Sequence, residues 1–163
     1  MVEIKGGIAE LMEDAHRPYV VIADDEPATR ALIMKQMRDA GFDVVACENG
    51  RETIDRLKEI GSAIVVADWD MPELDGLECC RAVRELCELQ VLGQVYFILL
   101  SAKNEKEQIV AGFEAGIDDF IVKPHHPQEL VARVKAGERL LKLQNELVSR
   151  QREVAKINAE MMI

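Results

Sequence analysis

Short apolar runs alternate with amphipathic stretches along most of the chain. Runs rich in Val, Ile and Leu predict five strands, at 19–26, 42–48, 63–70, 94–102 and 118–124. Between them, apolar positions recur three and four residues apart, as on one face of a helix. Helices are therefore predicted at 27–41, 50–61, 75–89 and 106–116, and another starts near 126.

The alternation of strands and helices predicts an α/β fold with a doubly wound, five-stranded parallel sheet. The apolar runs are too continuous for an antiparallel sheet with one solvated face. In such a fold, ligands bind beyond the carboxyl ends of the strands, where the strand order reverses.

The last helical pattern does not stop at the end of this domain. Leucine or another apolar residue recurs every seven positions, at Leu140, Leu147, Val154 and Met161. Leu143 and Ile157 fill the intermediate positions, with Arg150 as the one polar residue among them. This a/d pattern predicts a coiled coil and a parallel homodimer. The alternative is a single amphipathic helix that folds back on its own domain.

Three segments follow from these patterns: an N-terminal extension at 1–17, a globular domain at 18–136 and a coiled-coil linker helix at 137–163. Apolar positions in the extension have helical spacing, but Gly6-Gly7 interrupts it, so a short helix and a loose tail are equally compatible. The extension has neither the basic start nor the apolar core of a secretory signal.

Composition narrows the class of protein. The chain is 48% hydrophobic and 31% charged, as in soluble globular proteins, and its net charge of −10 argues against a nucleic-acid surface. No apolar run reaches the roughly 18 residues of a membrane span. The cysteines, Cys47, Cys79, Cys80 and Cys87, lack zinc-site spacing. We expect reduced, partly buried thiols and a cytoplasmic protein.

Polar residues gather where the predicted strands end. Asp24 and Asp25 end the first strand, Asp68 the third, Ser101 the fourth and Lys123 the fifth. Three converging carboxylates repel one another unless a cation lies among them, and oxygen ligands alone suit Mg²⁺. A lysine and a hydroxyl can hold phosphoryl oxygens. Asp68 can then act as a nucleophile that forms an aspartyl phosphate.

With these residues, the chain resembles the receiver domain of bacterial two-component response regulators, the CheY-like superfamily with a flavodoxin-like fold. The resemblance covers about residues 18–136. It rests on the pair Asp24-Asp25, on Asp68 within "DWDMPELDG", on Ser101-Ala102 and on Lys123-Pro124, which occur in the family's order.

The resemblance implies a role for each matching residue. A histidine kinase or phosphotransfer protein would phosphorylate Asp68. The acid pair, Asp68 and the backbone carbonyl of Asp70 would hold Mg²⁺, and the Lys123-Pro124 peptide would be cis. Ser101 stands where Thr is commoner.

Three further positions follow from the same resemblance. Phe120 would be the aromatic switch residue; lacking a hydroxyl, it could switch only by packing, next to the base of the last helix, or it is a plain core residue. Asp70 and Lys103 would reach the mouth of the site and tune the lifetime of the phosphoryl group.

Other residues have simpler interpretations. Asp75 is expected mainly to cap the third helix, and Asp24 or Asp25 could cap the first. His125-His126 have no third ligand nearby in the sequence, so we expect a solvated loop instead of a metal site.

The hypothesis that results is a phosphorylation-controlled switch, not an enzyme, that signals through its C-terminal coiled coil. The tail resembles linkers that precede diguanylate cyclase, phosphodiesterase or phosphatase domains. One alternative is a haloacid-dehalogenase-type phosphatase, although in those enzymes the nucleophile comes first and the acid pair last. Another is an inert dimerisation scaffold, which the complete set of site residues disfavours.

Overall fold

The computed structural model describes residues 17–162, so the N-terminal extension predicted at 1–17 lies outside them except for Arg17. The expected alternation of strands and helices is confirmed in the described part. The elements are β1 (Tyr19–Ala23), α2 (Pro27–Asp39), β2 (Val44–Cys47), α3 (Gly50–Ile60), β3 (Ala63–Asp68), α4 (Gly76–Glu88), β4 (Val95–Ser101), α5 (Lys106–Ala115), β5 (Asp119–Val122) and α6 (Pro127–Met161).

All five strands are parallel and lie in the order β2-β1-β3-β4-β5. The predicted doubly wound sheet with a long C-terminal helix is thereby confirmed. The strand order reverses between β1 and β3, where Ala23 pairs with Ala67. The carboxyl ends of these two strands therefore lie side by side at the place where this kind of fold binds ligands.

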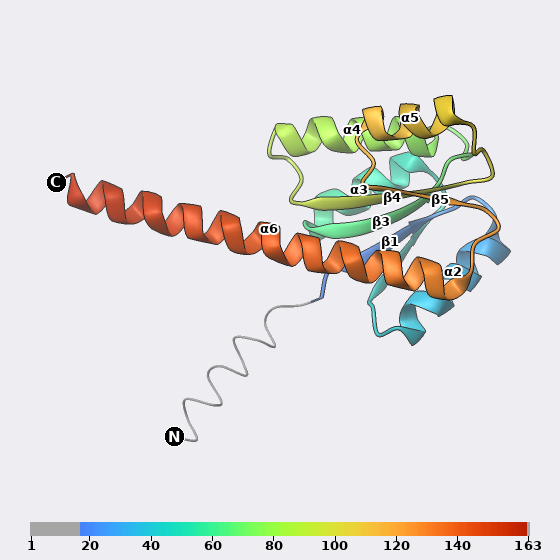
Figure 1. Ribbon diagram of the computed structural model, residues 1–163, viewed down its shortest axis with the longest axis horizontal. Helices are drawn as coiled ribbons and strands as arrows, with labels where there is room; N and C mark the ends of the chain where they lie inside the picture. The colour runs from blue at the N-terminus through green and yellow to red at the C-terminus, as the bar shows by residue number, and fades with distance from the viewer. Residues whose placement is uncertain (1–16, 163) are drawn as a thin grey trace, which may run out of the picture.

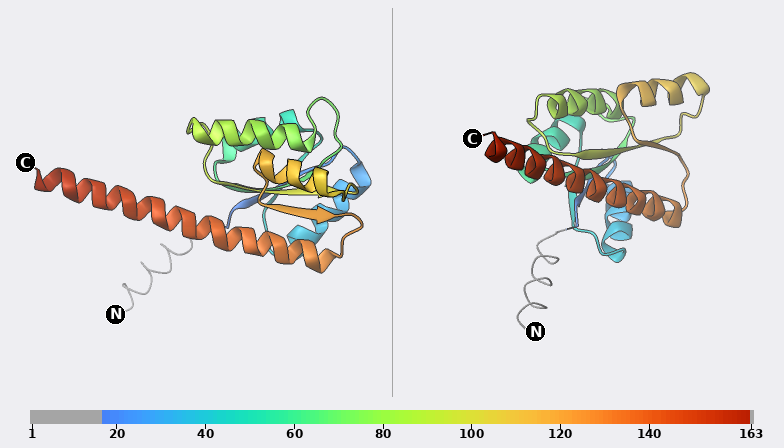
Figure 2. Two further views of the ribbon diagram at one scale, coloured as in Figure 1. Left: turned by 45° about the horizontal axis from the view of Figure 1, so that its top comes forward. Right: turned by 60° about the vertical axis from the view of Figure 1, so that its left-hand side comes forward.

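The sheet is covered on both faces, as its continuous apolar strands predict (Figures 1 and 2). Alternate strand residues point to opposite faces and form two separate clusters. One cluster, built around Phe97 and Leu99, packs against α3 and α4. The other, built around Ile98 and Leu100, packs against α2 and α6.

The cysteines belong to the apolar packing, as expected. All four lie in the described part of the chain as free thiols, and Cys47, Cys79 and Cys80 are buried. Burial raises the pKa of Cys47 to about 11, of Cys79 to about 12 and of Cys80 to about 11. These thiols are thus protonated at neutral pH and act as small apolar side chains.

Helix α6 packs on the sheet only along its first half. Its buried residues are Leu130, Val134, Gly137 and Leu141, and beyond them the helix projects away from the domain (Figure 1). The predicted boundary at 136/137 therefore falls inside a continuous helix. The seam residues stay exposed, Leu147 at 58% and Val154 at 55%. The alternative in which this helix folds back on its own domain is wrong.

Within residues 17–162, none of the helices combines the length and apolar character that crossing a membrane requires.

Candidate functional site

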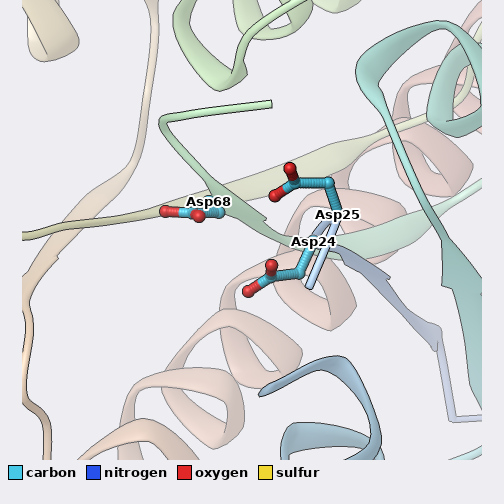
Figure 3. Close-up of side chains that lie close together, drawn as sticks. All are labelled: Asp24, Asp25 and Asp68. Atoms are coloured by element: carbon cyan, nitrogen blue, oxygen red, sulfur yellow. The ribbon is translucent and has the colours of Figure 1, made fainter. Parts of the chain in front are cut away.

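Three carboxylates meet at the carboxyl edge of the sheet. Asp24 and Asp25 directly follow β1, and Asp68 is the last residue of β3 (Figure 3). One oxygen from each lies within 4.8 Å of the others. The structure thus brings together the three acids predicted from the strand ends, and it does so because β1 and β3 are neighbours.

Asp24 is the buried member of this cluster, with 2% of its surface exposed. Its Oδ1 accepts a hydrogen bond from the backbone N–H of Glu26, 2.9 Å away. Burial raises the pKa of the Asp24 carboxyl; the Glu26 N–H opposes this effect, and the Asp68 carboxylate adds to it. Glu26, and neither Asp24 nor Asp25, is the N-cap of α2. Capping is therefore not what holds these two acids in place.

Lys123 supplies the positive charge of the site from the loop after β5. Its Nζ lies 2.9 Å from Asp68 Oδ1, and the Asp68 side chain is only 13% exposed. The backbone N–H of Lys123 also donates to the carbonyl of Ser101, which ties the ends of β4 and β5 together. The Lys123-Pro124 peptide is cis, as the resemblance implied.

Ser101 ends β4 and is 1% exposed. Its hydroxyl oxygen accepts a hydrogen bond from the backbone N–H of Lys103 at 2.9 Å. The side chain is therefore held at the same edge of the sheet as Asp68, where a small shift of β4 would move it.

The residues present fit a hard divalent cation. Three carboxylates face one lysine, which leaves two negative charges in excess. The Oδ2 atom of Asp24 is buried and has no hydrogen-bond partner among the described residues, although burying an unpaired carboxylate oxygen is costly. Oxygen donors without nitrogen or sulfur are the set that Mg²⁺ prefers. Within residues 17–162, this is also the one cluster of acidic, His or Cys side chains with metal-binding spacing.

A lysine and a tryptophan form the outer wall of the site. Lys103 Nζ lies 3.2 Å from Asp70 Oδ1, and the same nitrogen lies 5.0 Å from the centre of the Trp69 ring. The expected approach of Asp70 and Lys103 to the mouth of the site agrees with this pair. The contact of Trp69 with Lys103 was not predicted from the sequence, although the position of Trp69 directly after Asp68 was an available signal.

Phe120 lies on the opposite face of the sheet from the one expected. It packs in the cluster with α4 and meets the Trp69 ring edge-on, at 6.4 Å between ring centres. Its neighbour Ile121 faces α6 instead. The expectation that Phe120 lies next to the base of the last helix is therefore wrong, because successive residues of a strand point to opposite faces.

The loops at this edge are held by local caps. Asp75 caps α4 in a reciprocal capping box with Glu78, as predicted. His126 caps α6 and its Nδ1 accepts from the backbone N–H of Gln128. His126 is exposed, as the predicted solvated loop requires, whereas His125 is half-buried.

A shallow hollow adjoins the acid cluster. Five of the seven residues around it are acidic, namely Asp25, Asp70, Glu73, Asp75 and Glu78, and the other two are Met71 and Pro72. Beside Asp25, the acid cluster therefore presents a negatively charged rim to solvent.

Sequence comparison matches residues 20–135 to the family "Response regulator receiver domain". The transcriptional regulatory protein ResD of Bacillus subtilis is 37% identical over 125 residues, which are 77% of this chain and 50% of ResD. The chain spans about half the length of the curated relatives it matches.

Solved structures agree with this match. A putative response regulator from Chloroflexus aurantiacus is 29% identical with a TM-score of 0.68, and the match covers 76% of this chain and 99% of that one. A putative response regulator/GGDEF domain protein is 28% identical with a TM-score of 0.67, over 77% of this chain and 51% of that protein.

Gly76 gives a test of how tightly the backbone holds this site. A Cβ at this position would lie within 3 Å of the backbone carbonyl oxygen of Asp68 and of the Leu99 side chain. We expect Gly76→Ala to destabilise the fold by about 1–3 kcal/mol, since a backbone atom cannot move aside freely. Urea unfolding measures this change, and amide chemical shifts of residues 68–70 report the displacement.

The matched control is Gly112→Ala. A Cβ there would mainly meet the flexible end of the Ile117 side chain. Helix propensity favours alanine over glycine by about 1 kcal/mol, so this variant should be close to neutral. Equal unfolding midpoints for the two variants would contradict the tight packing of Gly76 against Asp68.

Proposed function

The chain belongs to the response regulator receiver domain family, and from this premise we propose that it is a phosphorylation-controlled switch whose phosphoacceptor is Asp68. The observation that carries the proposal is the pairing of Asp68 with Lys123, at 2.9 Å, beside the buried acid Asp24. A carboxylate in this position is fixed, charged and open to a donor on one side.

The transfer begins when one carboxylate oxygen of Asp68 attacks the phosphorus of a phosphohistidine on a histidine kinase or phosphotransfer protein. The P–O bond forms as the P–N bond breaks, and the bonding pair returns to the imidazole nitrogen. Lys123 holds one phosphoryl oxygen through its ammonium group, and the Ser101 hydroxyl donates to another. Water later attacks phosphorus, restores the carboxylate and releases inorganic phosphate.

We expect Asp24, Asp25, Asp68 and the backbone carbonyl of Asp70 to hold Mg²⁺, which when bound supplies positive charge to the transferring phosphoryl group. Asp25 is the exposed member of the pair, and both of its oxygens are free of the backbone hydrogen bond that Asp24 accepts. We therefore expect Asp25 to bind Mg²⁺ more closely than Asp24 does.

The acidic rim beside the acid cluster indicates which kind of protein surface can donate the phosphoryl group. A donor protein that places its phosphohistidine over this rim should carry basic residues around the histidine, because unlike charges favour encounter and correct orientation. Free, buried thiols support the expectation that the chain works in the cytoplasm. Its acidity keeps nucleic acid an unfavourable partner for this segment.

The signal must reach α6 through the end of the sheet. A phosphoryl group that draws Ser101 inward would shift β4 and, through the Lys123–Ser101 backbone bond, β5. Phe120 then repacks against Trp69, while Ile121 moves against α6 on the other face. Both arrangements must be accessible before phosphorylation, since a modification shifts an equilibrium only by its differential interaction with two states.

The output is the exposed half of α6. Its apolar residues lie along one stripe, and we propose that a second copy of the chain covers it in a parallel coiled coil. Arg150 weakens the middle of this seam, because its charge cannot be buried without cost. The similar GGDEF-containing protein is compatible with a tail that connects to an output domain.

Asp68→Asn should abolish phosphoryl uptake from acetyl phosphate while the fold stays intact. The reason is that an amide oxygen is a poor nucleophile for this transfer. Intact mass and acid lability of the label measure the uptake in Mg²⁺ buffer. Asp55→Asn, an exposed acid on α3, is the control and should label like wild type. Label at the wild-type level in Asp68→Asn would refute the assignment. Continuous turnover of p-nitrophenyl phosphate would favour the phosphatase alternative.

Asp25→Asn should weaken Mg²⁺ binding about tenfold or more, and Asp24→Asn should weaken it less, because one Asp24 oxygen is already engaged. Trp69 is the only tryptophan of the chain and directly follows Asp68, so its fluorescence can follow a Mg²⁺ titration. An Asp25→Asn titration that superimposes on that of wild type would show that the metal ligands are wrongly assigned.

Lys103 and Asp70 should have opposite effects on the lifetime of the phosphoryl group. Lys103→Ala frees the Asp70 carboxylate to orient water and opens the mouth, so we expect dephosphorylation to speed up about tenfold. Asp70→Ala should slow it. Decay of the label on Asp68 measures both rates, and identical decay in both variants and wild type would exclude the role.

Leu147→Lys should raise the dissociation constant of the homodimer at least tenfold, because Leu147 is a seam position whose exposed side chain needs an apolar partner. Ser149→Lys, on the outer side of the coil, adds the same charge and should leave the constant unchanged. Sedimentation at tens of micromolar protein measures it. A monomeric wild-type chain at that concentration would rule out the proposed seam.

A further inference from the structure

Arg17, just before β1, binds a residue in the first half of α6. Its Nε donates to Glu138 Oε2 at 2.6 Å, and its Nη2 donates to Glu138 Oε1 at 3.1 Å. This two-bond geometry is the strong form of an arginine–carboxylate pair, because the planar fork of donors matches both oxygens.

The same guanidinium holds a second segment. Its Nη1 donates to the carbonyl of Ala40, the C-cap of α2, at 3.2 Å. Its central carbon lies 3.9 Å from the centre of the Phe42 ring. Phe42 is 3% exposed and belongs to the cluster between α2 and α6. One side chain thus joins the chain just before β1, the end of α2 and α6.

Glu138 lies where α6 leaves the domain. Gly137 and Leu141 are the last two buried residues of the helix, and Leu143 is already 57% exposed. Arg17 therefore contacts the last turn that the domain still holds. The helix continues for about 20 residues beyond this turn, or about 30 Å, so a small rotation here displaces its far end by much more.

Helix α2 connects this contact with the acid cluster. At its first turn, Arg30 Nη1 donates to the backbone carbonyl of Asp24 at 2.8 Å. At its last turn, Ala40 accepts from Arg17. A rigid helix between the two contacts can carry a displacement of the acid pair to the base of the tail.

We propose that Arg17 is a clamp that fixes the direction in which the tail leaves the domain and ties this direction to α2 and to the start of β1. The clamp rests on the proposed function only in that the tail carries the signal. It gives the chain a second connection between site and tail, on the α2 side, besides the one through β4 and β5.

An isolated pair on the surface would not support such a role, because exposed ion pairs contribute little to stability. This guanidinium instead engages a carboxylate with two bonds, a backbone carbonyl and an aromatic ring at once. Such contacts are coupled, and a double-mutant cycle measures the coupling.

The first experiment is this cycle on the full chain, with Arg17→Ala, Glu138→Ala and the double variant compared by urea unfolding. We expect the free energy of unfolding to fall clearly less in the double variant than the sum of its decreases in the two single variants. Arg139→Ala removes the same charge from the adjacent, exposed position of α6 and should be additive with Glu138→Ala. Additive losses in the Arg17 cycle would overturn the clamp.

The second experiment follows hydrogen exchange of α6 amides at 139–145. We expect Arg17→Ala to speed their exchange about fivefold or more, since the last attached turn opens locally. Arg17→Lys keeps the positive charge but loses the planar guanidinium that makes two bonds to Glu138. It should therefore also speed the exchange of these amides. Equal exchange in wild type and Arg17→Ala would overturn the clamp.

A third measurement separates the clamp from the proposed switch. Beryllofluoride with Mg²⁺, a phosphoryl mimic, should change the dimer dissociation constant of the wild-type chain. This change should be smaller in Arg17→Ala. Labelling of Asp68 by acetyl phosphate should stay normal in the same variant. Lost labelling in wild type would refute the switch and leave the cycle and the exchange as tests of the clamp. Normal labelling with an undiminished mimic effect in Arg17→Ala would refute the clamp alone.

Discussion

Crowding of three carboxylates at one edge of the sheet is the constraint on which the rest of this structure depends. Asp24, Asp25 and Asp68 repel one another, and the burial of Asp24 adds a desolvation cost. Lys123 offsets one of the three charges. The apolar strands behind the acids supply the rigidity that keeps them together, because every residue of β1 pairs with a residue of β3. A cation or a phosphoryl group thus enters a site whose geometry the core has already set.

Each face of the sheet provides a separate set of contacts through which a change at that site can spread. On one face, Trp69 lies between Lys103 at the mouth and Phe120 in the core. On the other face, α2 and α6 share a cluster, and Arg17 joins the C-terminal end of α2 to Glu138 within α6. A change at the acid cluster can therefore reach α6 through the end of the sheet or along α2. The tail is suited to report such changes, since its far half touches nothing else in the described chain.

Much of the site was predictable because its residues follow directly from local patterns. An apolar run ends in an acid, a hydroxyl or a lysine, and parallel strands place these ends on one edge. The capping role of Asp75 was equally local, because a capping box spans only four residues. The expected place of Phe120 next to the base of the last helix was wrong, since a short strand at the edge of the sheet gives little alternation from which to assign its faces. The contact between Lys103 and Trp69 joins the loops that follow β4 and β3, and the only signal for it in the sequence was the position of Trp69 directly after Asp68.

The sequence by itself determined the order and type of the elements, the parallel sheet, the acid cluster and the seven-residue repeat of the tail. Each of these depends on interactions between near neighbours or on the periodicity of a helix or strand. The tertiary structure decided where the tail becomes free of the domain and what holds it there. Arg17 and Glu138 are 121 residues apart, and their contact exists only because the sheet and α2 bring the start of β1 within reach of α6. Hydrophobic periodicity indicates which face of a helix is buried, but it cannot indicate which distant polar side chain will meet the residues at the border of that face.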